Sequence, residues 1–356
     1  MAIVAHTHPF VIGVDTHARN HSFAILTAAT GEQIAAKQFP TTPAGLNRAV
    51  AWVSRLVGGD LTALWVIEGA ATYGARLAQL VTDAGYEVAE APRMDARAHH
   101  RVGKSDPLDA HRIGAAALPL ENDRLRHPRS DDDLRPALRV LTTARDHMSA
   151  ERTANINALT ALLRTADLGL DVRRPLTSGQ IVEVAAWRSR SETLALSTAR
   201  AEACRLAKRI RVLDAELAEN SSDLEKTLQQ SKAGPLLDLA GVGPVTAAVA
   251  YSAWSHRGRL RDEAAFAALA GVSPIPASSG NTTRHRLNRG GDRRLNRALH
   301  MATVTRMAHD PETRAYVDRR RAEGRTTKEI RRCLKRYLAR RIYRILEALH
   351  RPTATA

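Results

Sequence analysis

The first 120 residues alternate short strand signals with helix signals, and this order restricts the fold more than any other feature of the chain. Three apolar segments separated by turn residues predict an antiparallel meander at Phe10–Asp15, His21–Ala28 and Glu32–Phe39. The pattern then predicts a helix at 42–56 with Pro43 in its first turn, a strand at 61–68, a helix at 73–84, a strand at 86–90 and a helix from about Asp106. The predicted order, βββαβαβα, is typical of an α/β domain with a central sheet.

The rest of the chain is predicted to be almost entirely helical. Apolar residues recur at intervals of 3, 4 or 7 from about Asp131 to Asn220, with one break at Gly169–Gly179. This spacing predicts two long amphipathic helices that form an antiparallel hairpin or a dimerising coiled coil. From Pro235 onward we expect a helix, a turn at 241–244, a second helix, an Ala-rich helix at 263–270, a loop at 271–291 and Arg-rich helices to Leu349. The predicted division is an α/β domain at 1–125, a helical spacer at 126–232, a mainly α domain at 233–349 and a disordered tail at 350–356.

Basic residues are concentrated at the C-terminal end of the chain. The formal net charge is +16, from 53 basic and 37 acidic residues. Residues 1–120 hold ten of each, whereas residues 281–356 hold 21 basic and 7 acidic residues, a net charge of +14. Of the basic residues 46 are arginine, whose planar guanidinium binds phosphate oxygens in a bidentate fashion, although a GC-rich genome also enriches arginine. The distribution predicts a polyanion-binding module attached to a neutral domain.

Membrane and disulfide-rich secreted proteins are excluded as classes. The chain has no run of 18 apolar residues, and its N-terminus lacks the basic-then-apolar pattern of a signal peptide. Cys204 and Cys333 match neither zinc nor redox spacing. We therefore expect a soluble cytoplasmic protein, associated with the nucleoid and without a membrane partner.

Four acidic residues occupy positions that could form one metal site. Asp15 ends the first predicted strand, Glu68 ends the strand after the first helix, and Asp106 and Asp109 share one helix face. In a βββαβαβα sheet the first and fourth strands are neighbours, which brings Asp15 and Glu68 together. Carboxylates gathered there repel one another unless cations are bound, and two Mg²⁺ ions about 3.5–4 Å apart, with Mn²⁺ as the alternative ion, suit phosphodiester chemistry. The alternative is that the acids merely end strands or cap helices, with Asp106 as an N-cap before Pro107.

These acids lie in segments that resemble a known family. Ile-Gly-Val-Asp at 12–15, Trp-Val-Ile-Glu at 65–68 and Lys-Ser-Asp-Pro-Leu-Asp-Ala at 104–110 are similar to the Asp-Glu-Asp-Asp tetrad of DEDD-type insertion-sequence transposases. That family includes site-specific DNA invertases, and its N-terminal domain has a RuvC-like, ribonuclease-H-type fold. The resemblance implies that Asp15, Glu68, Asp106 and Asp109 bind metal and take part in catalysis.

The C-terminal region resembles the same family. Segments 269–274, 277–280 and 289–299 are similar to its transposase domain, in which a serine beside a glycine attacks the DNA backbone and forms a phosphoserine link. The resemblance implies that Ser279, with Ser278 as the alternative, is the nucleophile; without the surrounding pattern both would be ordinary loop serines. It also implies a structured guide RNA encoded by the element, although no RNA-recognition motif is visible, and self-association as a dimer or tetramer.

Several further residues are candidates for contact with nucleic acid. The turn Gly241-Val-Gly243-Pro244 resembles a helix–hairpin–helix, which presents backbone N–H groups to a phosphate, although a simple helix stop at Gly241 fits equally well. Arginines near the two serines are predicted to hold the scissile phosphate or its neighbours: Arg284, Arg286, Arg289, Arg293, Arg294 and Arg297. The runs at 319–321, 331–332 and 340–341 are predicted to make generic backbone contacts or to form a solvated basic face. Three histidines without ligand partners are predicted to be structural: His99, His100 and His111.

Together these features predict a DNA transposase or recombinase, in which metal-bound carboxylates and a serine cleave and exchange DNA strands. A RuvC-like junction resolvase that uses water as its nucleophile, or a DNA invertase, is the nearest alternative. A non-catalytic nucleic-acid-binding protein, whose basic C-terminal region carries all of the activity, is the alternative from another class.

Overall fold

The computed structural model describes residues 2–92, 106–129, 134–278, 285–286, 288 and 290–351. The chain folds as two compact units, Met1–Ser130 and Asp131–Ala356, each with cores of its own. Several predictions fall on residues outside the described ranges: those for His99, His100, Lys104, the start of the helical region at Asp131, Ser279, Arg284, Arg289 and the tail from 352 onward.

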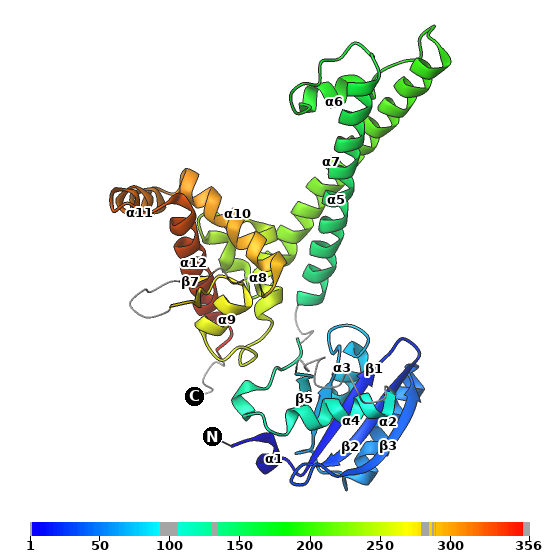
Figure 1. Cartoon of the computed structure of the whole chain (residues 1–356), viewed down its shortest axis with the longest axis vertical. Coiled ribbons are helices and arrows are strands. Elements are labelled where there is room, and N and C mark those ends of the chain that lie inside the picture. The colour runs from blue at the N-terminus through cyan, green and yellow to red at the C-terminus, as the bar shows by residue number, and fades with distance from the viewer. Residues whose placement is uncertain are drawn as a thin grey trace. The chain divides into compact units, whose positions relative to one another are not determined.

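The N-terminal unit is built on a five-stranded mixed sheet with the strand order β3-β2-β1-β4-β5 (Figure 1). The predicted antiparallel meander is confirmed as β1 (Phe10–Thr16), β2 (Asn20–Thr27) and β3 (Gln33–Pro40). The strands β4 (Leu64–Ile67) and β5 (Glu87–Glu90) run parallel to β1. The register pairs Val14 with Ile67, so the first and fourth strands are neighbours, as predicted.

Helices cover both faces of this sheet. The helices α2 (Pro43–Leu56) and α3 (Ala75–Asp83) pack on the face that carries Phe23 and the fully buried Trp65. The helix α4 (Asp106–Ala117) packs on the other face, against Leu64 and Val66. The start of α2 is confirmed where the sequence predicts it, because the Thr42 side chain accepts a hydrogen bond from the Gly45 N–H and Pro43 occupies the first turn.

The contact between α4 and the sheet depends on Gly13. A Cβ atom at this position would lie 2.1 Å from the Ala110 carbonyl oxygen and 2.5 Å from the Gly114 nitrogen. The backbones of β1 and α4 therefore touch directly, which is possible only without a side chain at Gly13. This contact sets the height of α4 above the sheet.

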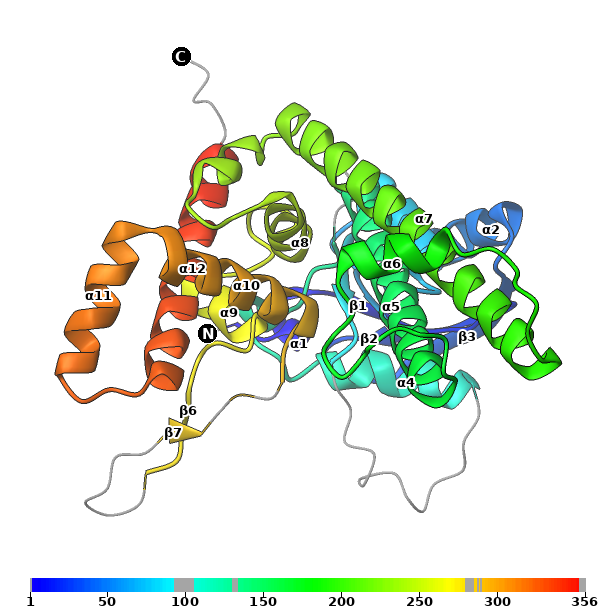
Figure 2. The same cartoon turned by 90° about the horizontal axis from the view of Figure 1, so that it is seen from above.

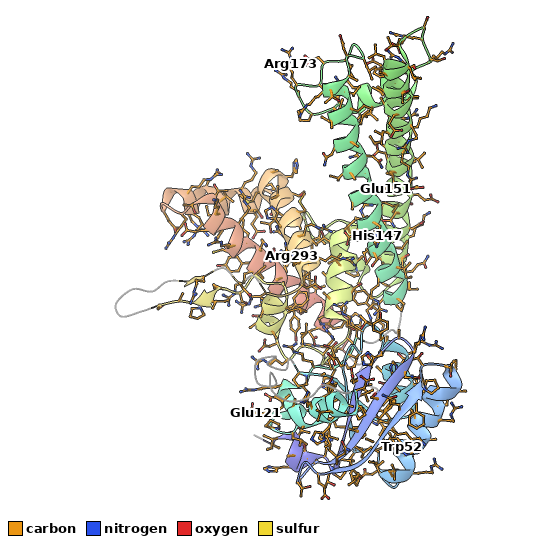
Figure 3. All side chains as sticks on the ribbon, turned by 45° about the vertical axis from the view of Figure 1, so that its right-hand side comes forward. Trp52, Glu121, His147, Glu151, Arg173 and Arg293 are labelled. Atoms are coloured by element: carbon orange, nitrogen blue, oxygen red, sulfur yellow. The ribbon has the colours of Figure 1, made fainter. Side chains whose placement is uncertain are left out.

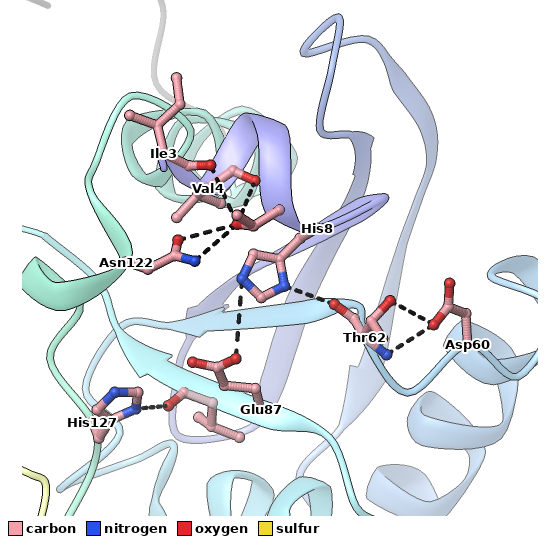
Figure 4. Close-up of polar contacts among 10 residues, drawn as sticks. Ile3, Val4, His8, Asp60, Thr62, Glu87, Asn122 and His127 are labelled. Atoms are coloured by element: carbon pink, nitrogen blue, oxygen red, sulfur yellow. Dashed lines mark hydrogen bonds and ion pairs between the residues drawn. The ribbon is translucent and has the colours of Figure 1, made fainter. Parts of the chain in front are cut away.

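A short helix that the sequence does not predict, α1 (Val4–Thr7), fastens the start of the chain (Figure 4). Its Thr7 hydroxyl donates to Oδ1 of Asn122, the first residue of the 3₁₀ helix η2 (Asn122–Arg124), at 3.1 Å. His8 Nδ1 lies 2.7 Å from the Thr62 carbonyl oxygen, and His8 Nε2 lies 4.0 Å from Glu87 Oε2. These contacts brace the end of the sheet where β1 begins, opposite the end that carries Asp15.

The second unit begins with an antiparallel helical hairpin of α5 (Arg135–Thr165) and α7 (Leu194–Gln230), with α6 (Ser178–Ala185) packed on α7 (Figures 1 and 2). Interhelical ion pairs join Glu151 on α5 to Arg209, with a Nε–Oε1 distance of 2.6 Å (Figure 3 shows Glu151), and Arg152 to Asp214. The sequence predicts one helix after the 169–179 break; this is wrong. Residues 186–193 interrupt it, and a new helix begins after Thr193, whose side chain accepts from the Leu196 N–H.

The C-terminal helices form the rest of this unit: α8 (Pro244–Trp254), α9 (Glu263–Leu269), α10 (Arg293–His309), α11 (Pro311–Ala322) and α12 (Thr327–Leu349). The segment before α8 is a short 3₁₀ helix, η3 (Gly234–Asp238), rather than the α-helix expected. The base of the hairpin shares the core of these helices through Leu138, Leu224 and Leu228. The predicted loop contains a small two-stranded ladder of β6 (Ile275–Pro276) and β7 (His285–Arg286).

The predicted start of a disordered tail at His350 is wrong for that residue. The His350 ring lies 4.6 Å from the Trp254 ring, centroid to centroid, and its Nε2 lies 3.2 Å from the Tyr251 hydroxyl. Contact with two buried aromatic rings holds the half-buried His350 against the core. Among the described residues, no helix combines the length and apolar character that a membrane crossing requires.

Candidate functional site

Two acidic side chains and a histidine meet at the carboxyl end of β1. His17 Nε2 lies 3.0 Å from Asp15 Oδ2 and 3.8 Å from Asp106 Oδ1. One potential ligand atom from each of the three residues lies within 4.8 Å of the others. The Asp15 side chain is only 10% exposed, whereas those of His17 and Asp106 are about half exposed. A nearly buried carboxylate beside a second carboxylate favours a bound cation.

The fold explains why Asp15 and Asp106 meet. Asp106 is the first residue of α4, one turn before Ala110, whose carbonyl oxygen rests on Gly13. Asp15 follows Gly13 by two residues on β1, so the close contact between strand and helix brings the two acids together. Gln38 on β3 steadies the arrangement, because its Nε2 donates to Asp106 Oδ2 at 3.3 Å and to Ser22 Oγ at 2.9 Å.

Glu68 directly follows the strand next to β1, and Asp109 lies three residues after Asp106 on α4; these are the other two predicted ligands. Glu68 follows β4 directly; its N–H donates to the Val14 carbonyl at 3.0 Å, and its own carbonyl accepts from the Thr16 hydroxyl at 2.8 Å. Its backbone is therefore fixed next to Asp15, while its side chain is exposed. Asp109 accepts from Arg112 Nη1 at 3.0 Å. Neither residue belongs to the group of three, and their roles as metal ligands stay predictions.

His17 is a candidate ligand that the sequence does not single out. The one signal available is its position, two residues after an acid that ends a strand. A second histidine holds the His17 backbone in place: His21 Nδ1 accepts a hydrogen bond from the His17 N–H at 3.3 Å. His21 is 1% exposed, and burial lowers its pKa, which favours the neutral ring that this acceptor role requires.

The donor set fits a small divalent cation. Carboxylate oxygens are the ligands that Mg²⁺ prefers, and Mn²⁺ accepts the same oxygens together with an imidazole nitrogen. Asp15, Asp106 and His17 could hold such an ion, and the exposed side of the cluster leaves room for a phosphate oxygen.

The second candidate site is the segment that carries the serines. Ser278 is exposed just after β6. The ends of the segment are held together at its base, where the Asp292 N–H donates to the Leu269 carbonyl at 2.6 Å. Gly271 and Gly291 have φ angles of +65° and +94°, and a Cβ on Gly291 would lie 2.4 Å from the Leu269 oxygen. Both positions therefore require glycine, which gives these motif residues a structural role.

Helices α10 and α12 brace this base further. Asn296 Nδ2 donates to the Ala270 carbonyl at 2.7 Å, and Lys335 Nζ donates to Asn296 Oδ1 at 2.7 Å. Lys335 is half-buried, and burial lowers the pKa of its ammonium group. A chain of hydrogen bonds thus joins α12 to the turn that precedes the serines.

The predicted phosphate-binding arginines divide into two groups. Arg286 on β7 is exposed, and Arg293 is the first residue of α10 (Figure 3). Arg294 and Arg297 instead pair with Asp146 on α5, with a distance of 2.7 Å from Arg294 Nε to Asp146 Oδ2. These two arginines link α10 to the helical hairpin, a role that the sequence does not indicate.

The two glycines of the 241–244 turn also differ. Gly241 has a φ of +73°, and a Cβ there would lie 2.7 Å from the Ala302 carbonyl oxygen, so this glycine is needed for packing on α10. Gly243 is the N-cap of α8; nothing lies within 4 Å of a Cβ placed there, and no side chain caps the helix. The first N–H groups of α8 are therefore open to an acceptor from outside.

Comparison with known proteins identifies the chain. Residues 12–166 match the family model of DEDD transposases of the IS110 type, described as a transposase, and residues 233–318 match that of the IS116/IS110/IS902 transposase family. The "Insertion element IS900 uncharacterized 42 kDa protein" of Mycobacterium paratuberculosis is 27% identical over 89% of this chain and 90% of its own length. The "Insertion element IS110 uncharacterized 43.6 kDa protein" of Streptomyces coelicolor is 28% identical over 88% of each chain.

These matches, the mixed α/β unit and the acidic cluster define the class of protein as an insertion-sequence transposase, a DNA-binding enzyme of DNA recombination. Within this class the chain belongs to the IS110 family.

Proposed function

We propose that this transposase cuts and rejoins DNA with a divalent-metal site on the N-terminal unit and a serine nucleophile on the C-terminal unit. The observation that carries the proposal is the grouping of Asp15, His17 and Asp106 at the end of β1. Cleavage of a phosphodiester needs positive charge beside the phosphate, and a close carboxylate pair is itself stabilised by a cation.

Asp15 and Asp106 would hold Mg²⁺, with Mn²⁺ as the alternative, and His17, Glu68 and Asp109 would complete the shell. When bound, the ion supplies charge that stabilises the developing oxyanion of the phosphate. The strand order, an antiparallel meander followed by parallel strands, supports a RuvC-like, ribonuclease-H-type assignment for residues 1–125.

Ser279, or its neighbour Ser278, would attack the DNA. Its Oγ bonds to phosphorus, one phosphorus–oxygen bond of the strand breaks, and the leaving oxygen gains the proton that the serine gives up. Attack by a different strand end reverses the step, frees the serine and joins the new strands. The fixed base of this segment supports the proposal, because a nucleophile must be held close to its target.

The same mechanism requires further contacts with nucleic acid. The open N-terminus of α8 at Gly243 would hold a DNA phosphate in the manner of a helix–hairpin–helix, and Arg284, Arg286, Arg289 and Arg293 would flank the scissile phosphate. From the family resemblance we also propose a structured guide RNA, association with the nucleoid, and a dimer or tetramer formed through the spacer at 126–232 as a coiled coil. The domain at 233–349 would carry the serine chemistry.

The metal half of the proposal is tested with Asp15→Asn and a matched control, Asp123→Asn, which neutralises an exposed acid outside the cluster. We expect D15N to lose Mn²⁺ binding, measured by calorimetry, and metal-dependent DNA cleavage, while D123N keeps both. Equal metal binding by the two variants would refute the metal site. DNA binding in the wild type without cleavage under any metal condition would favour the non-catalytic alternative.

The serine half is tested by trapping a covalent protein–DNA adduct on a nicked substrate and mapping it by mass spectrometry. We expect the adduct at Ser279 or Ser278, and its loss in the variant of that residue alone. Cleavage that persists when both serines are alanine would support a junction resolvase that uses water.

A further inference from the structure

A cavity of about 550 Å³ lies in the C-terminal unit, lined by the 271–274 turn, by Arg286 of β7 and by residues of α11 and α12. Val272, Pro274 and Ile330 give it apolar lining. Among the described residues that line it are one carboxylate, that of Glu329, and six cationic side chains: Arg286, Arg320, Arg325, Arg332, Lys335 and Arg336. The cavity is therefore apolar in part and strongly positive.

Most of this positive charge is not neutralised within the protein. Arg320 pairs with Glu323, but no carboxylate in the described part of the chain lies within 4.0 Å of the guanidinium groups of Arg325, Arg332 or Arg336. Glu329 is engaged at the start of α12, where it accepts from the Thr326 N–H at 2.9 Å and the Thr326 hydroxyl at 2.8 Å. These hydrogen bonds lower the pKa of Glu329, and the nearby charges of Arg325 and Arg332 lower it further. One carboxylate therefore faces several cations, and most of their charge is left for an anion from outside.

The size and lining of the cavity narrow the choice of anion. A free phosphate would fill only a small part of this volume and would leave the apolar side chains without a partner. A nucleotide presents both a phosphate and a flat base, and enzymes that bind unstacked bases place them against apolar side chains. A base inside a duplex cannot reach such a surface, because it is stacked between its neighbours.

We propose that this cavity holds one unpaired nucleotide of a nucleic-acid strand, with its phosphate on Arg325, Arg332 and Arg336 and its base on Val272 and Pro274. The proposal rests on the proposed function and deepens it, because the 271–274 turn leads directly into the segment that carries the serines. Lys335, Asn296 and Ala270 tie the wall of the cavity to the base of that segment, so a nucleotide bound here would hold its strand beside that base. A displaced DNA strand and a guide RNA share this chemistry.

The two free cysteines allow a direct test on the full-length chain. Cys333 lines the cavity, whereas Cys204 lies on α7 with its Sγ 3.4 Å from the Ala185 carbonyl oxygen. Alkylation by iodoacetamide, followed by mass spectrometry, is compared for protein alone and with single-stranded DNA, single-stranded RNA or duplex DNA of one sequence. We expect a single strand at ten times its Kd to slow alkylation of Cys333 about tenfold, and that of Cys204 not at all. The strand that protects more strongly identifies the natural occupant.

Two outcomes of this footprint would overturn the proposal. One is equal protection of both cysteines, or of neither. The other is protection of Cys333 by duplex DNA as strong as that by a single strand. The footprint is repeated on the D15N and S279A variants, which lack the proposed chemistry. Protection that survives there supports the cavity even if the serine mechanism fails.

Two double variants distinguish binding in the cavity from general attraction between basic residues and nucleic acid. Arg332→Ala with Arg336→Ala removes two charges from the cavity, and Arg314→Ala with Arg321→Ala removes two from exposed positions on α11. We expect the cavity pair to weaken single-strand binding about tenfold for each arginine beyond the control pair. Val272→Phe, which fills the cavity without changing charge, should abolish protection of Cys333 while the melting curve stays cooperative. Equal losses in the two arginine pairs would overturn the proposal.

Discussion

Replacing Gly13 by alanine should damage the proposed metal site without changing any of its candidate ligands. The added Cβ would lie 2.1 Å from the Ala110 carbonyl oxygen, whereas ordinary contacts begin at 3.4 Å. Both partners are backbone, one in a central strand and one in a helix, so neither can turn aside as a side chain would. The helix α4 must move away from β1 by about 1.3 Å to relieve the clash.

This displacement is large compared with what a metal site tolerates. Asp106 lies one turn before Ala110 on the same helix, so it would be carried away from Asp15 by a similar distance. Metal ligands need to be placed within about 0.5 Å, and a misplacement of about 1 Å can reduce catalysis by about 100-fold. Overpacking of this kind also costs about 1–3 kcal/mol of stability, which still leaves a folded protein if the parent has ordinary stability.

Urea unfolding, Mn²⁺ titration and DNA cleavage test this prediction together. We expect G13A to lower the free energy of unfolding by about 1–3 kcal/mol and cleavage by about 100-fold. Gly179→Ala is the control, because this glycine lies in α6 and a Cβ atom added to it would have its nearest neighbour, Thr177 Oγ1, 3.9 Å away. Alanine at that helical position should be neutral or slightly stabilising. A folded G13A protein with wild-type Mn²⁺ affinity would refute the argument that the contact between β1 and α4 places Asp106.

Two further predictions concern His17 and Glu263. His17→Ala should keep the fold, since the side chain is about half exposed, and should weaken Mn²⁺ more than Mg²⁺ in calorimetry, because an imidazole nitrogen suits Mn²⁺ better; equal weakening would argue against ligation by His17. Glu263 on α9 accepts hydrogen bonds from Arg344 and Arg340, which lower its pKa from 4.5 to about 2. A carboxyl whose pKa is lowered in the folded state stabilises the fold above pH 4.5, and this stabilisation is lost as the pH falls toward 2. Glu263→Gln should therefore lower the urea midpoint at about pH 6, whereas at about pH 2.5 its midpoint should approach that of the wild type. Glu219→Gln, at an exposed position on α7, should leave the midpoint unchanged at both pH values.

The elements predicted most accurately from the sequence are those whose ends are set by nearby residues. The start of α2 depends on Thr42 and Pro43, and the start of α9 on an Asp262 side chain that accepts from the Ala265 N–H at 2.7 Å. Both signals lie within a few residues of the helix they begin. The pairing of the first and fourth strands also follows from the order of elements, because that order leaves few ways to arrange the sheet.

Features set by distant contacts could not be predicted in this way. The break at 186–193 interrupts an apolar pattern that continues from Val184 to Leu194, and α6 turns back because Val184 packs in one core with Ile210 of α7. The position of His17 depends on Asp106, which is 89 positions further along the chain and is itself held by Gln38. Periodicity and spacing carry no information on such contacts.

The same distinction applies to the net charge of +14 in residues 281–356. Several of these arginines are used inside the protein: Arg294 and Arg297 pair with Asp146, and Arg340 and Arg344 with Glu263. Ion pairs of this kind neutralise charge that would otherwise attract phosphate. Among the described residues no carboxylate lies within 4.0 Å of the guanidinium groups of Arg325, Arg332 or Arg336, which line one cavity and share only the longer-range attraction of Glu329. The composition indicates a basic region, but the pairing of its arginines indicates which of them remain available to a phosphate from outside.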